Sequence, residues 1–157
     1  MKPDYTGLKP LLAVSQITPA LWQGMRPASY AEWDLVVSCE EHLARKPMEG
    51  YRGVVIHVAM RDEDDFEIPT RAIAVAATAA AAMIREGGKV LVHCSGGLNR
   101  SSLVTMEILT AGAGYEPRAA LALLRAKRAD FCLCNRAFER HALGELLPTA
   151  ETSTFRV

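Results

Sequence analysis

The chain has 157 residues, which is the length of one domain and enough to bury a hydrophobic core. Lysine and arginine number 18, aspartate and glutamate also number 18, and hydrophobic residues make up 50% of the chain. This balance is typical of a globular protein and argues against a nucleic-acid partner, since domains that bind nucleic acids usually carry a basic excess.

Hydropathy and cysteine content indicate the cellular compartment in which the protein is expected. No apolar run approaches the length of a membrane-spanning helix, and the first residues lack the apolar stretch of a signal peptide. Four cysteines are too few for a disulfide framework. We therefore expect a cytoplasmic protein without membrane association. No cluster of side chains has the spacing of a metal site, so we expect neither a metal nor another cofactor.

Strand patterns dominate the first half of the chain and helix patterns the second. Short apolar runs predict strands at 13–17, 21–22, 34–39, 53–60 and 89–93. Alanine-rich or amphipathic stretches predict helices at 70–86, 100–112, 116–129 and 134–147. This order predicts a single α/β domain over residues 1–157, with ends at about 1–8 and 149–157 that are loosely held.

A cysteine followed six positions later by an arginine occurs three times, at 39–45, 94–100 and 134–140. The spacing alone is therefore weak evidence, and the context must select among the three. Only the middle copy follows a buried strand, contains two glycines and opens a predicted helix. The first copy has two glutamates inside the loop, and the third lies within a helical pattern.

The middle copy has the chemistry of an anion site with a nucleophile. Glycines let backbone N–H groups converge on an anion, and the start of a helix favours negative charge. The same environment favours the thiolate of Cys94, which is the nucleophilic form of cysteine. Arg100 can bind two oxygens of a phosphate, and Ser101 can assist the departure of the sulfur. His93 can hold the shape of the loop through a buried hydrogen bond.

The sequence HCSGGLNRS, residues 93–101, resembles the HCxxGxxRS signature of cysteine-dependent protein phosphatases of the small dual-specificity class. The resemblance extends from about residue 17 to 147. It implies a central, mostly parallel sheet flanked by helices. It also implies hydrolysis of phosphotyrosine, and of phosphoserine and phosphothreonine, on a phosphoprotein substrate through a cysteinyl-phosphate intermediate. The implied phosphate-binding residues are Ser95, Gly96, Gly97, Leu98, Asn99 and Arg100.

The resemblance further implies a general acid, an aspartate on a loop roughly thirty residues before the cysteine. Asp62 lies 32 positions before Cys94, and Phe66 fits the apolar residue that follows the acid in this family. A protonated carboxyl at this place would donate to the leaving oxygen and later accept a proton from water. Asp64 remains the alternative, because a shift of two positions in the alignment would select it.

The resemblance also implies supporting roles for two more residues, and the presence of each residue has a simpler explanation as well. Cys39 ends a predicted strand at a position where a few relatives keep a cysteine that forms a disulfide with the catalytic one. The sequence favours the simpler explanation, a small apolar side chain that closes a core strand. Asn135 matches an asparagine in the family's last segment, where it would brace the phosphate loop or cap a helix.

Other functions remain open at this point. RNA 5′-triphosphatases of this fold also carry an asparagine before the arginine, as Asn99 does here, although the chain lacks a basic surface. A sulfurtransferase also uses a cysteine loop that cradles an anion. A non-catalytic module that recognises phosphorylated partners is the alternative of another class.

Overall fold

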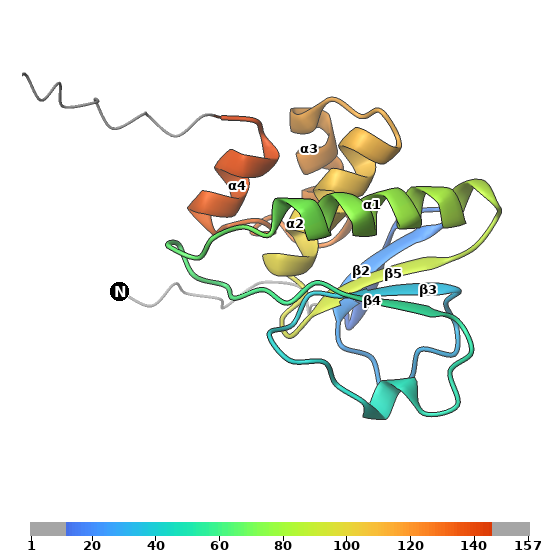
Figure 1. The fold of residues 1–157 in the computed structure, drawn as a ribbon. Helices are drawn as coiled ribbons and strands as arrows, with labels where there is room; N and C mark the ends of the chain where they lie inside the picture. Colours follow the sequence, from blue (N-terminus) through green and yellow to red (C-terminus); the bar gives the residue numbers. More distant parts are fainter. Residues whose placement is uncertain (1–11, 146–157) are drawn as a thin grey trace, which may run out of the picture.

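A five-stranded sheet forms the centre of the protein in the computed structural model, which describes residues 12–145 (Figure 1). The strands are β1 (Val14–Thr18), β2 (Leu21–Met25), β3 (Leu35–Ser38), β4 (Val54–His57) and β5 (Val90–Cys94). Their spatial order is β1-β2-β5-β3-β4. β1 and β2 form an antiparallel hairpin, and every other pair of neighbours is parallel.

The parallel register brings three strand ends to one edge of the sheet. Met25 of β2 pairs with Cys94, and Ser38 of β3 pairs with the preceding residue of β5. All residues of β3 and β5 are buried, as expected for central strands that are covered on both faces. The carboxyl edge of such a sheet is where side chains from neighbouring strands meet.

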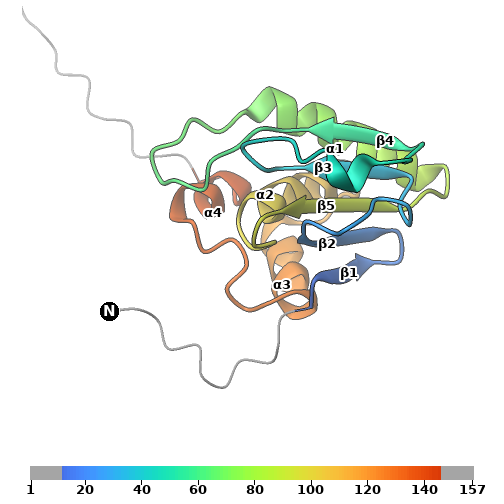
Figure 2. The same cartoon turned by 90° about the horizontal axis from the view of Figure 1, so that it is seen from below.

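The helices lie together on one face of the sheet (Figure 1). They are α1 (Thr70–Arg85), α2 (Arg100–Glu107), a π-helical continuation of α2 (Ile108–Gly112), α3 (Pro117–Lys127) and α4 (Arg136–Ala142). The prediction of helices flanking a mostly parallel sheet is confirmed. The α-helices of residues 12–145 occupy a single face, while the short 3₁₀ helix η1 (Lys46–Met48) and its neighbouring loops cover the other (Figure 2).

Two predicted elements differ most from the structure, and both are shorter there. The predicted strand 53–60 leaves the sheet after His57, so the segment that follows is free to form the loop that carries Asp62. The predicted helix 134–147 begins at Arg136 and ends before Gly144, whose φ of 69° is unfavourable for other residues. The predicted loose ends, 1–8 and 149–157, lie outside the described residues. No helix within 12–145 is long and apolar enough to cross a membrane.

Small side chains let α1 pack closely on the sheet and on α2. The buried stripe of α1 contains Ile73 and four alanines, while its opposite side is exposed. Alanine favours the helix intrinsically and leaves room for the neighbouring backbone. The larger core side chains are therefore supplied by the sheet and by α2, for example Leu103 and Met106.

A second, smaller cluster covers the opposite face of the sheet. Tyr30, Val36 and Leu91 are fully buried there, and partly buried tryptophans pack around them. The Tyr30 hydroxyl lies 2.7 Å from Nε2 of His93, whose side chain is completely buried. Burial is the main cause that raises the pKa of Tyr30 to about 12, so its hydroxyl stays protonated and can donate to the imidazole.

The environment of His93 keeps its ring neutral. Burial, with a contribution from the Arg26 guanidinium, lowers the pKa of His93 from 6.5 to about 4. The Glu40 carboxylate lies 3.9 Å from Nδ1 and favours the charged ring, but complete burial is the larger effect. We assign the proton to Nδ1, because Nε2 accepts from Tyr30.

Ala80 tests the close packing of α1, because it is fully buried. Replacing it by leucine adds three carbons where no space exists, and we expect the free energy of unfolding to fall by about 1–3 kcal/mol. Ala72→Leu on the exposed side of the same helix is the control, with an expected change within about 0.5 kcal/mol. Urea unfolding of both variants measures the difference, and equal losses would contradict the packing described here.

The buried His93 predicts a loss of stability in mild acid. The unfolded chain, with an ordinary histidine pKa, takes up a proton near pH 6.5, whereas the folded protein does so only near pH 4. Stability is therefore fully present above pH 6.5 and falls toward pH 4, by an amount on the order of 3 kcal/mol from this residue. The free energy of unfolding of His93→Gln should depend less steeply on pH over this range. Equal slopes for the two proteins would refute the assignment.

Candidate active site

The loop between β5 and α2 holds the Cys94 thiol at its floor. Two groups approach the sulfur: the backbone N–H of Gly97, which donates to it with its nitrogen at 3.2 Å, and the hydroxyl of Ser101 at 3.3 Å, which can donate to a thiolate. Cys94 has a relative exposure of 2%, while Ser95 and Gly96 above it are exposed. The thiolate of a cysteine is its nucleophilic form, and groups placed in this way can donate to it.

Arg100, the first residue of α2, lies across this loop. Its Nη2 is 3.1 Å from Oγ of Ser95, and its Nη1 donates to the carbonyl of Met60 at 3.2 Å. The Nε atom is buried without a hydrogen-bond partner. The guanidinium is thus held between the cysteine loop and the segment after β4, with donor capacity left for an anion.

The loop packs so tightly on β2 that only glycine fits at position 97. Gly97 has a φ of 66°, and a Cβ there would lie 2.4 Å from the carbonyl carbon of Gly24. A Cβ at Gly96 would meet nothing closer than 4.0 Å. The two adjacent glycines therefore differ in what they do, because Gly97 makes the close approach and Gly96 faces open space.

A buried polar network, which the sequence did not predict, supports the loop from behind. Arg128 donates through Nε to the Gly97 carbonyl at 3.1 Å, and through Nη1 to Ser15 at 3.1 Å and to the Leu12 carbonyl. Gln23 donates to the same Gly97 carbonyl at 3.2 Å and to Ser102. Burial lowers the pKa of Arg128. This network fixes the carbonyl of Gly97, while the N–H of the same residue is directed at the Cys94 sulfur.

Asp62 lies beside the loop and is held by two amides. Its Oδ2 accepts from Nδ2 of Asn99 at 2.9 Å, and its Oδ1 accepts from Nδ2 of Asn135 at 3.0 Å. Asp64 is an exposed residue of the same segment. Of the two predicted candidates, it is therefore Asp62 that contacts a residue of the cysteine loop.

Asn135 caps α4 and also contacts Asp62 and the cysteine loop. Its Oδ1 accepts from the N–H groups of Ala137 and Phe138 and so caps α4, while its Nδ2 binds Asp62. Its own N–H donates to Oδ1 of Asn99 at 3.0 Å. One amide side chain has a donor end and an acceptor end, so capping a helix and bracing the site do not compete.

One of the remaining cysteines contacts the cysteine loop, because Sγ of Cys134 lies 3.4 Å from Oδ1 of Asn99. Cys39 is fully buried at the end of β3, and its N–H donates to the His93 carbonyl at 2.8 Å. Burial, with a smaller effect of Cys94, raises the pKa of Cys39 well above its usual range. A neutral thiol is a weak nucleophile, and the redox role of Cys39 stays a prediction. Cys132 is buried and Cys134 is exposed.

Glu40 is the second feature that sequence reasoning missed. It follows Cys39 in the first copy of the cysteine–arginine pattern, which was set aside because of its glutamates. In the structure its side chain lies against the middle copy and accepts from Oγ of Ser95 at 3.0 Å. The rule that ends of parallel strands converge could have placed it there.

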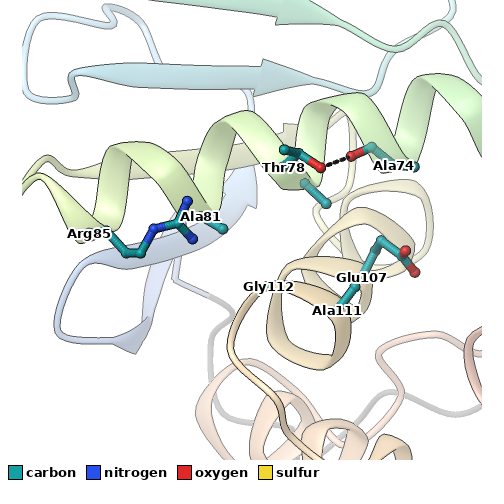
Figure 3. A pocket seen from close by; sticks show the side chains of 8 residues that line it. Ala74, Thr78, Ala81, Arg85, Glu107, Ala111 and Gly112 are labelled. Atoms are coloured by element: carbon teal, nitrogen blue, oxygen red, sulfur yellow. Dashed lines mark hydrogen bonds between the residues drawn. The ribbon is translucent and has the colours of Figure 1, made fainter.

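Within residues 12–145 no cluster of metal ligands competes with this site, and a cleft elsewhere on the protein does not include its residues. Residues 12–145 contain no group of three or more His, Cys, Asp or Glu side chains that could hold a metal ion. A cleft of about 230 Å³ lies between α1 and the end of α2, lined mainly by small residues such as Ala81, Ala111 and Gly112 (Figure 3). None of the predicted site residues lines it.

Comparison with solved structures shows the same fold in several phosphatases. The active form of Tk-PTP is 26% identical, with 85% of this chain and 95% of that chain covered and a TM-score of 0.71. Human DUSP28 is 20% identical, with 88% and 94% covered and a TM-score of 0.72. Among curated proteins, the phosphoglucan phosphatase DSP4 of Castanea sativa is 36% identical over 76 residues. That match spans 48% of this chain and only 20% of the length of the relative.

A family model matches most of the chain, including the cysteine loop. The model described as the dual specificity phosphatase catalytic domain matches residues 29–142. This range contains the segment of Asp62, the cysteine loop and the helix capped by Asn135. Because the match covers well over half of the chain, the protein belongs to the dual specificity phosphatase family.

Proposed function

We propose that this protein hydrolyses phosphomonoesters on protein side chains, phosphotyrosine and also phosphoserine and phosphothreonine, through a cysteinyl-phosphate. The observation that carries the proposal is the buried Cys94 sulfur with the Gly97 N–H and the Ser101 hydroxyl directed at it. A loop of N–H groups and a guanidinium around a thiolate suits a tetrahedral dianion. Such donors can stabilise the charge of the transition state without a metal ion.

The first step transfers the phosphoryl group to sulfur. The thiolate of Cys94 attacks phosphorus, an S–P bond forms, and the bond between phosphorus and the leaving oxygen breaks. Arg100 and the N–H groups of the loop bind the non-bridging oxygens. The carboxyl of Asp62 donates its proton to the leaving oxygen, so that an alcohol or phenol departs.

The second step returns the enzyme to its starting state. Water attacks phosphorus while the carboxylate of Asp62 accepts a proton from it, and the S–P bond breaks to release inorganic phosphate. Ser101, 3.3 Å from the sulfur, donates to the departing thiolate. Asn99 and Asn135 keep the carboxylate beside the loop between the two steps.

A phosphorylated glucan is the second candidate substrate, because one relative is named for that activity. Carbohydrate sites usually present aromatic side chains on which sugar rings pack. Trp22 pairs in register with Leu91, with Lys89 5.9 Å from its ring, and Trp33 precedes β3. Both tryptophans thus belong to the amino-terminal part of the parallel strands, away from the cysteine loop. This placement favours a protein substrate over a glucan.

Replacement of the nucleophile tests the reaction. The wild-type protein should hydrolyse p-nitrophenyl phosphate equally well with and without EDTA, whereas Cys94→Ser should lose activity by about 10³-fold or more. Val75→Ala, at an exposed position of α1 outside the site, is the control and should stay within about twofold of wild type. An inactive wild-type protein would favour the non-catalytic module, and loss of activity in EDTA would refute the metal-free mechanism.

The assignment of the acid is tested by two neighbouring substitutions. Asp62→Asn should lower kcat by about 10²-fold, because the leaving oxygen then departs without a proton. The loss should be larger for phenyl phosphate than for p-nitrophenyl phosphate, since phenoxide is the poorer leaving group. Asp64→Asn should change kcat by less than about threefold. The reverse ranking of the two variants would assign the acid to Asp64.

A further inference from the structure

A buried carboxylate next to the phosphate loop has no role in the mechanism described above. Glu40 has a relative exposure of 5%, although it lies two residues after the end of β3. Its Oε2 lies 3.5 Å from the Arg26 guanidinium but makes no hydrogen bond. Burying a carboxylate costs several kcal/mol unless its partners compensate, and an apolar side chain would fill the same space at lower cost.

The other oxygen of Glu40 connects it to the catalytic arginine. Oε1 lies 3.0 Å from Oγ of Ser95, which lies 3.1 Å from Nη2 of Arg100. A serine hydroxyl has one proton, and the carboxylate can only accept it. The lone pairs of Ser95 are therefore turned toward the guanidinium. The direction of both hydrogen bonds follows from the acceptor oxygen that Glu40 presents to Ser95.

The hydrogen bonds from Glu40 through Ser95 to Arg100 form a relay that holds one side of the guanidinium. A backbone carbonyl holds the other side. The Met60 carbonyl accepts from Nη1 at 3.2 Å, and Ser95 accepts from Nη2. With both terminal nitrogens held, the plane of the guanidinium is set before an anion arrives. Orientation before binding lowers the reorganisation that binding and catalysis require.

We propose that Glu40 is a positioning residue that orients Arg100 for oxyanion binding through the hydroxyl of Ser95. The inference rests on the proposed function only in taking Arg100 as a ligand of the phosphate. Glu40 does not touch the substrate in this scheme. A purely structural role would show itself in stability alone, whereas a positioning role changes the affinity for the oxyanion and requires Ser95.

Removing the acceptor tests the relay. Glu40→Met keeps the volume of the side chain and leaves no buried charge, so we expect a folded protein. Its dissociation constant for inorganic phosphate, measured by calorimetry, should rise about tenfold, and kcat/KM for p-nitrophenyl phosphate should fall by a similar factor. Glu40→Gln should recover most of the loss, because its amide oxygen can still accept from Ser95. Glu41→Gln is the control, since Glu41 is exposed and pairs with Arg61.

A double-mutant cycle separates a relay from two independent effects. Ser95→Ala interrupts the same path, so Glu40→Met combined with Ser95→Ala should bind phosphate no more weakly than Ser95→Ala alone. Unchanged phosphate affinity in Glu40→Met, or additive losses in the double variant, would overturn the inference. A wild-type protein that binds phosphate without hydrolysing esters would instead overturn the proposed function, and the affinities of the variants would still decide the role of Glu40.

Discussion

The contact between Gly97 and Gly24 is the constraint on which the rest of the site depends. The loop after β5 must turn back over the sheet before α2 begins, and it does so by resting on the backbone of β2. Only a residue without a side chain, in a left-handed conformation, can occupy position 97. The same turn directs the Gly97 N–H at the sulfur of Cys94, so the fold and the chemistry depend on one close approach.

Charge around the loop is balanced locally by hydrogen bonds as well as by ion pairs. The guanidinium of Arg128 contacts backbone carbonyls and a serine, whereas the carboxylate of Asp62 is held by the amides of Asn99 and Asn135. Neutral partners hold a charged group in place without cancelling its charge. Arg128 thus supports the backbone of the loop, and two neutral amides place Asp62 beside it, in a protein whose formal net charge is zero.

Sequence and structure agree best where a residue acts through its local surroundings. The strand, the two glycines and the start of the helix around Cys94 are contiguous, so their pattern was sufficient to locate the loop. Glu40 shows the opposite case. It lies 54 positions before Cys94, and it contacts the cysteine loop only because β3 and β5 are neighbours in the sheet. Within its own segment of the sequence, Glu40 argued against an anion site, because it placed a carboxylate inside the first cysteine–arginine loop.

The sequence by itself determined the α/β class, the position of the cysteine loop and the segment that carries the candidate acid, because each rests on short-range spacing and propensity. Tertiary structure alone decided which aspartate contacts the loop, which side chains support it from behind and which carboxylate lies beside Ser95. These contacts join residues from separate strands and helices. Their pairing depends on strand order and register, which are set by the packing of the whole domain and leave no local pattern in the chain.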